Sequence, residues 1–101
     1  MPTGDGYPTE TELKLIREWD YKDPHGWLDF IKTCWWSADW GWREQEYRDA
    51  GEKWRRCLVS TGGWSGNEEI VEAMRGNLFL WHLTWEEHRK GGHFKFSRVK
   101  P

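Results

Sequence analysis

Residues 60–69, with the sequence Ser-Thr-Gly-Gly-Trp-Ser-Gly-Asn-Glu-Glu, hold the groups best suited to binding a ligand. Three glycines within five residues allow positive φ angles and the close approach of another group. A helix capped by Ser65 or Asn67 would direct unpaired backbone N–H groups and the positive end of its dipole at an anion. We therefore predict a pocket for a phosphate, a nucleotide or a peptide carboxylate, formed by Thr61, Gly62, Gly63, Trp64, Ser65, Gly66 and Asn67.

The same segment also fits a simple strand-to-helix turn in which Trp64 is part of the core. Glu68 and Glu69 favour this alternative, because acidic residues are common in the first turn of a helix and would repel an anion. The segment matches neither the phosphate-binding Gly-x-x-x-x-Gly-Lys-Ser/Thr pattern nor the Gly-x-Ser-x-Gly pattern of a nucleophilic serine. Both interpretations of Trp64 therefore stay open.

Four tryptophans within eight residues, Trp35, Trp36, Trp40 and Trp42, form a second candidate site. Exposed Trp side chains stack on bases or sugars and anchor protein partners. Trp35 falls on the apolar face of a predicted helix and is assigned to the core, whereas Trp40 and Trp42, like Trp64, follow no helical or strand period. We predict that Trp36, Trp40 and Trp42 form an interface with a host protein or with a second copy of the chain. The alternative is that they fill a core poor in aliphatic residues.

No other cluster of reactive side chains has the spacing of a known type of site. His82, His88 and His93 lack the Cys-x-x-Cys or His-Glu-x-x-His spacing of a zinc site, so neither a metal nor a cofactor is expected. Enzyme activity is the least favoured function class, since no catalytic acid pair or Ser/His/Asp set can be singled out. Seven basic residues of the second half of the chain could gather on one sheet face and bind phosphate or an acidic protein, although a solvated strand face is the favoured interpretation. They are Arg55, Arg56, Arg89, Lys90, Lys95, Arg98 and Lys100.

The composition predicts one small domain with an aromatic core. Of the 101 residues, 37% are hydrophobic and 17% are aromatic, including ten Trp. Aromatic side chains must supply much of the buried area, and the regular periods assign Trp27, Trp35, Trp81 and Trp85 to this role. The net charge is −2, with six basic and twelve acidic residues (−6) in 1–52 and nine basic and five acidic residues (+4) in 53–101. This balance argues against general nucleic-acid binding.

Cys34 and Cys57 are predicted to be two buried thiols rather than a disulfide, because both lie in apolar patterns. No apolar run reaches the 18 residues of a membrane span, and the N-terminus lacks the apolar segment of a signal peptide. The predicted location is therefore the cytoplasm.

Local signals predict two helices in the first third of the chain. Residues 1–8 are rich in Gly and Pro and are predicted to be irregular. Thr9 and Glu12 have the spacing of a capping box, which starts a helix that ends near Asp20. Asp23 followed by Pro24 predicts the start of a second helix of about three turns.

Two hairpins are predicted to follow. Residues 42–48 and 53–60 can pair across a turn at 49–52, although the first segment would also suit a helix. A short helix over 67–75 ends at Gly76-Asn77. The alternation in 81–86 predicts a strand, with a helix over 78–89 as the alternative, and a return strand follows a turn at 90–92. If the turn spans 89–92 instead, His88 lies opposite His93. We predict an α+β fold: a small antiparallel sheet of three to four strands, two N-terminal helices and one short helix between hairpins.

Two stretches of the sequence resemble a family of small bacteriophage proteins. The first is Ser-Thr-Gly-Gly-Trp-Ser-Gly-Asn-Glu at residues 60–68, and the second is Gly-Gly-His-Phe at residues 91–94. Asp23-Pro24-x-Gly26-Trp27 is also similar, so that the resemblance covers roughly residues 10–97. It implies a phage origin and a location in the cytoplasm of an infected bacterial host, and it assigns no activity and no catalytic residues.

Overall fold

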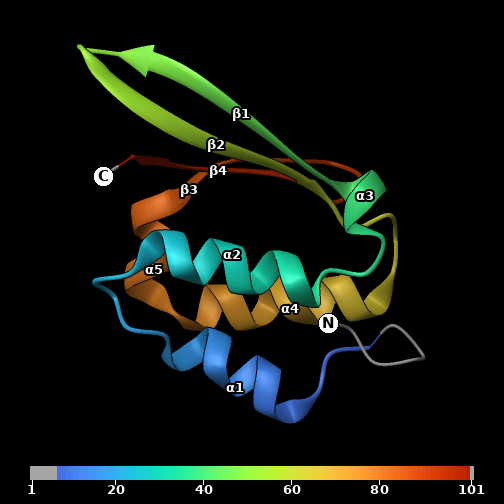
Figure 1. Ribbon diagram of the computed structural model, residues 1–101. Coiled ribbons are helices and arrows are strands. Elements are labelled where there is room, and N and C mark those ends of the chain that lie inside the picture. Colours follow the sequence, from blue (N-terminus) through green and yellow to red (C-terminus); the bar gives the residue numbers. More distant parts are fainter. Residues whose placement is uncertain (1–6, 101) are drawn as a thin grey trace.

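The computed structural model describes residues 7–100, which form an α+β fold of the predicted class. A four-stranded antiparallel sheet forms one layer, α2, α4 and α5 lie against one of its faces, and α1 packs beneath them (Figure 1). In chain order the elements are α1 (Glu10–Glu18), α2 (Pro24–Cys34), α3 (Ala38–Gly41), β1 (Trp42–Asp49), β2 (Glu52–Ser60), α4 (Ser65–Gly76), α5 (Leu78–Thr84), β3 (Trp85–Arg89) and β4 (His93–Val99). Of the segment predicted to be irregular, residues 1–6 lie outside the described residues.

The first two helices begin at the predicted capping residues. The Thr9 hydroxyl accepts a hydrogen bond from the backbone N–H of Glu12, and the Glu12 carboxylate accepts one from the backbone N–H of Thr9. Asp23 accepts a bond from the backbone N–H of Gly26, and Pro24 occupies the first turn of α2. These bonds satisfy N–H groups that a helix start would otherwise leave unpaired.

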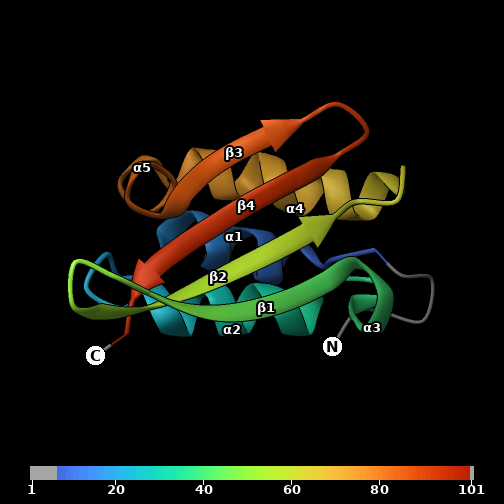
Figure 2. The same ribbon diagram turned by 90° about the horizontal axis from the view of Figure 1, so that it is seen from above.

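The strands are arranged in the order β1-β2-β4-β3 (Figure 2). Trp42 of β1 lies opposite Val59 of β2, and Val59 also lies opposite Phe94 of β4. The predicted first hairpin is therefore confirmed, and residues 42–48 are a strand rather than a helix. Ala50 and Gly51 connect its strands with φ angles of 53° and 80°, as expected for a two-residue type I′ turn.

Residues 78–84 form a helix, so the strand predicted to run over 81–86 is wrong in its first four residues. Asn77 explains the difference, because its side-chain oxygen accepts a hydrogen bond from the backbone N–H of Leu80 (3.3 Å) and caps α5. Leu80, Trp81 and Thr84 are buried on one face of this helix. A short apolar run satisfies both the strand period and the helix period, and here the cap favours the helix.

The second hairpin, β3–β4, is confirmed. The turn spans residues 90–92, so Arg89 lies opposite His93 and His88 lies opposite Phe94. The pairing of His88 with His93, which a turn over 89–92 would give, does not form. The register shifts between Trp85 and Glu87 because a bulge interrupts the pairing there. The imidazole ring of His88 is stacked on Phe94, with ring centroids 4.1 Å apart.

The hydrophobic core lies between the sheet and the helices and contains four of the ten tryptophans. Trp27 and Trp35 are almost completely buried. Their indole N–H groups donate to the backbone oxygens of Ile16 (3.0 Å) and Ser60 (3.2 Å). Each ring therefore fills a large volume without leaving its polar atom unpaired.

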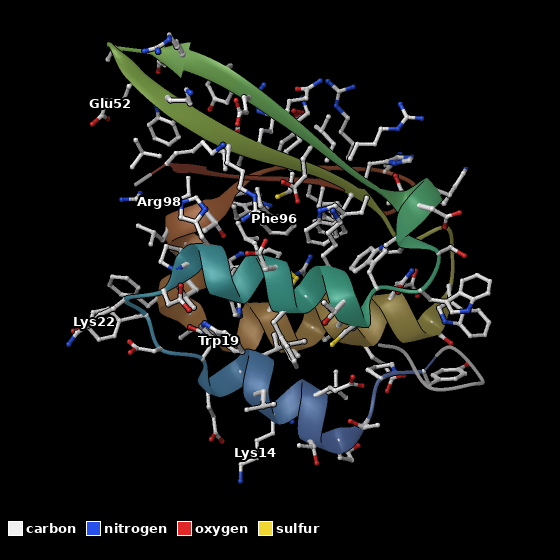
Figure 3. The ribbon with its side chains drawn as sticks, viewed as in Figure 1. Lys14, Trp19, Lys22, Glu52, Phe96 and Arg98 are labelled. Carbon is white, nitrogen blue, oxygen red and sulfur yellow. The ribbon has the colours of Figure 1, made fainter. Side chains whose placement is uncertain are left out.

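The prediction that Trp replaces aliphatic residues in the core is confirmed for three of its four residues. Trp81 is 9% exposed and packs against Phe96, which points from β4 toward the helices (Figure 3). Trp85 is 42% exposed, so its assignment to the core is wrong. Cys34 and Cys57 are both buried and free, as predicted. No helix within residues 7–100 is both long and apolar enough to cross a bilayer.

Candidate binding site

The two segments singled out in the sequence meet in space at one end of the sheet. They enclose a cavity of about 210 Å³ lined by Trp36, Ser37, Trp40, Thr61, Gly62, Trp64 and Asn67. We call these seven residues the aromatic site. The loop after β2 supplies one wall, and the connection from α2 through α3 supplies the other.

The glycine-rich loop follows a path that only glycine adopts easily. Gly62 and Gly63 have φ angles of 64° and 73°, in the region where a side chain causes strain. A Cβ atom at Gly62 would lie 3.0 Å from the ring of Trp40, which is tighter than an ordinary contact. The absence of a side chain at Gly62 therefore allows Trp40 to lie directly over the loop.

Trp64 is half-buried among other aromatic rings at the surface. Its ring is stacked on Trp36, with centroids 4.9 Å apart and planes inclined by 29°. Trp64 also packs against Tyr7, with 5.0 Å between the two ring centroids. The Tyr7 hydroxyl is hydrogen-bonded to the Ser65 hydroxyl (2.7 Å). Trp64 is therefore neither a fully buried core residue nor an isolated exposed ring.

Asn67 joins the two segments instead of capping α4. Its side-chain oxygen accepts from the backbone N–H of Trp36 (2.9 Å), and its amide nitrogen donates to the backbone oxygens of Trp36 (3.1 Å) and Thr61 (3.4 Å). The residue before α4 is Trp64, whose side chain makes no capping bond. The prediction that Ser65 or Asn67 caps this helix is therefore wrong, because the Asn67 side chain is already used for these bonds.

The predicted ligand-binding residues differ in their exposure. Gly62, Gly63 and Ser65 are exposed, whereas Gly66 is buried with Asn67. Thr61 is only 3% exposed, and its backbone N–H donates to the oxygen of Gly92 (3.0 Å). Buried Thr61 and Asn67 hold the loop in place, and the exposed loop residues are the ones that a ligand can reach.

The predicted interface residues divide in the same way. Trp40 is 63% exposed and Trp36 is 43% exposed. Trp42 is 5% exposed, packs edge-on against Trp35 (5.8 Å between centroids) and donates its indole N–H to Glu44 (3.0 Å). Trp42 therefore belongs to the core and cannot be part of an exposed interface.

The basic residues considered for one sheet face lie on both faces. Arg55 points toward α2, where its guanidinium is paired with Glu44 (2.8 Å) and Asp29 (2.7 Å). Arg56 points to the open face and is paired with Glu86 (2.8 Å). Because successive side chains of a strand point to opposite faces, neighbours such as these two arginines cannot gather on one side.

The histidines of α5, β3 and β4 have different surroundings. His82 is exposed on α5, while His93 lies beside Ser60, with 2.7 Å between its Nδ1 atom and the serine hydroxyl. Within residues 7–100, no group of His, Cys, Asp and Glu side chains has the arrangement to hold a metal ion.

Nothing in the local sequence places Tyr7 or Ser37 at the aromatic site. Tyr7 lies in a stretch predicted to be irregular, and nothing in its spacing indicates that it contacts Trp64. Ser37 has a positive φ of 59°, which turns the chain between Trp36 and α3. Serine has no marked preference for this conformation, so the turn depends on tertiary contacts.

The two stretches that resemble small bacteriophage proteins lie side by side in the structure. Besides the bond from Thr61 to Gly92, a Cβ atom at Gly92 would lie 2.1 Å from the Thr61 hydroxyl oxygen. Gly92 therefore allows the β3–β4 turn to approach the glycine-rich loop. No family model, curated protein or solved structure matches the chain. The phage resemblance accordingly stays a prediction.

Proposed function

We propose that the chain is a binding protein without enzymatic activity, and that the aromatic site holds a small ligand through a flat ring. A nucleobase is the ring that fits best, and the face of a sugar is the next. One observation carries the proposal: the glycine-rich loop and the stretch 36–40 line a single cavity, and two exposed Trp rings border it.

The rings of this site are held in place by bonds within the protein. Trp36 stacks on Trp64, and both main-chain polar groups of Trp36 are bonded to the buried side chain of Asn67. A ligand does not have to order these rings, which reduces the entropy lost on binding. Stacking of a base on an aromatic side chain contributes about 1–3 kcal/mol.

The start of α4 is a poor place for the anionic group of such a ligand. Glu68 lies in the first turn of the helix and Glu69 follows it, and both are exposed. Their negative charges oppose the attraction that the helix dipole would exert on an anion. The ring of the ligand is therefore the part that the aromatic site recognises.

Binding can be tested by tryptophan fluorescence and calorimetry with a panel of nucleosides, nucleotides and monosaccharides. Replacement of Trp40 by alanine should weaken the affinity by about 5- to 150-fold, the equivalent of one stacking interaction. The matched control is Trp85→Ala, because Trp85 is also exposed but lies on β3 next to α5, away from the aromatic site (Figure 1). An absence of both heat and quenching across the panel would contradict the proposal.

A second candidate function is protein interaction through the same surface. Trp36, Trp40 and Tyr7 are all more than a third exposed, and large exposed aromatic residues are typical anchors of protein interfaces. The partner would be a host protein, in line with the phage resemblance, or a second copy of the chain. A concentration-dependent dimer that is lost in Trp40→Ala would favour this function, whereas a strict monomer that recovers no partner from a host lysate would argue against it.

A further inference from the structure

The helices leave one face of the sheet uncovered (Figure 2). A second cavity, of about 370 Å³, opens on that face. Trp40 lines this cavity as well as the aromatic site. The other lining residues that matter for its chemistry are Arg43, Ser60, Glu87, Arg89, His93 and Lys95. We call them the basic cleft.

We propose that the basic cleft binds the phosphate of the ligand whose ring stacks in the aromatic site, so that the ligand is a nucleotide. This inference rests on the proposed function. Trp40 stands between the two cavities, and a nucleotide presents the matching pair of groups, a flat base and an anionic phosphate joined by a sugar.

The strand register places the cations on the same face. Arg43 lies opposite Leu58, Leu58 lies opposite Lys95, and Lys95 lies opposite Glu87. These four residues form one row across all four strands, with the apolar Leu58 between the two cations. Neighbouring strands are about 4.8 Å apart, so Arg43 and Lys95 are roughly 10 Å apart at their Cα atoms. Two side chains of this length can contact one phosphate above Leu58.

The next row along the strands adds hydrogen-bonding groups. Ser60 lies opposite His93, and His93 lies opposite Arg89. The serine hydroxyl and the histidine ring are within hydrogen-bonding distance of each other. The cleft therefore combines a hydroxyl, an imidazole, an ammonium and two guanidinium groups, which are the usual donors to phosphate oxygens.

Glu87 is the one carboxylate in this set of lining residues. Its oxygens accept from Arg89 (2.6 Å) and from Lys95 (3.2 Å). The hydrogen bond from Arg89, then that from Lys95, hold the pKa of Glu87 below its usual range, so the group is ionised at neutral pH. Glu87 thus keeps two cations oriented over the cleft and competes with an incoming phosphate. Arg43 makes no ion pair within residues 7–100, and its guanidinium is available to a ligand.

The test compares nucleosides with their 5′-monophosphates by calorimetry on the full chain at low ionic strength. The monophosphate should bind at least about tenfold more tightly than its nucleoside, as expected for a charge-assisted contact, and this advantage should shrink as salt is added. Arg43→Ala should remove the advantage and leave nucleoside binding unchanged. The matched control is Arg48→Ala, an exposed arginine of the same strand that lies outside the cleft.

Glu87→Gln gives the sharper result, because it should tighten monophosphate binding severalfold without affecting the nucleoside. Equal affinity for nucleoside and monophosphate would overturn the inference and leave the proposed function intact. A phosphate advantage that neither Arg43→Ala nor Glu87→Gln alters would also overturn it, by placing the phosphate elsewhere. If inorganic phosphate binds in an Arg43-dependent manner while no nucleoside binds, the proposed function fails and the link between the two cavities fails with it.

Discussion

Replacement of Asn67 by alanine should lower the free energy of unfolding and weaken ligand binding at the aromatic site. The side chain is 2% exposed and makes three hydrogen bonds, two to the main chain of Trp36 and one to that of Thr61. Alanine removes all three hydrogen bonds, and the main-chain groups of Trp36 and Thr61 are then paired only if water reaches them. Because these bonds connect the loop to the end of α2, their loss should also release the ring of Trp36.

The magnitude follows from the number and length of the bonds. A neutral hydrogen bond contributes about 0.5–1.5 kcal/mol net, and buried polar groups without a partner cost more. The two bonds to Trp36 have good lengths, whereas the 3.4 Å bond to Thr61 counts for less. We expect a loss of about 2–3 kcal/mol, a large part of the roughly 5–15 kcal/mol available to a domain of this size.

Asn77→Ala provides the matched control, since Asn77 is also a buried asparagine with three hydrogen bonds, to Ile16, Trp19 and Leu80. Urea unfolding followed by far-ultraviolet circular dichroism measures the stability of both variants without relying on the Trp rings. Both variants should lose a similar free energy of unfolding. When binding is measured at urea concentrations below the denaturation midpoint, only Asn67→Ala should lower the affinity for a nucleoside. A loss under 1 kcal/mol for Asn67→Ala, or equal effects of the two variants on affinity, would refute this reasoning.

Three further predictions concern stability and reactivity. Ala50→Asn should raise the free energy of unfolding by about 1 kcal/mol in urea titrations, because Ala50 has a φ of 53° in a turn that favours Asn-Gly; an unchanged midpoint would count against it. Burial raises the pKa of Glu44, but hydrogen bonds from Arg55 and Trp42 outweigh the effect of burial and hold this pKa below its usual range. Glu44 therefore stabilises the fold above its unfolded pKa of about 4.3 and loses this effect as the pH falls through its lower folded pKa, so Glu44→Gln should flatten the acid side of a melting temperature–pH profile. Burial raises the pKa of Cys34 to about 11 and of Cys57 to about 12, so neither thiol should react with a disulfide reagent at pH 8 until the protein is denatured, and rapid labelling of the native protein would contradict this.

Features that depend on neighbours in the sequence could be predicted. The capping box at Thr9 and the cap at Asp23 need only residues within one helical turn, and both are present. The turn at 49–52 is recognisable because its glycine and the flanking alternation lie within a few residues. The helix over 78–84 was less predictable, because its apolar pattern also suits a strand and the deciding bond comes from the side chain of Asn77.

The candidate site shows the same limit. Composition alone draws attention to residues 61–67 and to Trp36 and Trp40, since glycine clusters and unpatterned Trp are unusual. That these segments meet depends on the path from α2 to β1 and on the bonds of Asn67, which no local pattern contains. The basic cleft is harder still, because its row of residues exists only in the register of four paired strands.

The order of the strands has a consequence for how the chain folds. Each hairpin pairs strands that are neighbours in the sequence, whereas β2 and β4 are separated by α4, α5 and β3. Closing that long loop has to precede any gain from the β2–β4 contacts, so this pairing should limit the folding rate. The cleft row from Arg43 to Glu87 crosses this junction, and a chain with only its hairpins formed has no complete cleft. A ligand that spans both cavities would therefore bind only after the β2–β4 pairing has formed. The rate at which binding appears during refolding would thus measure the rate at which the sheet is completed.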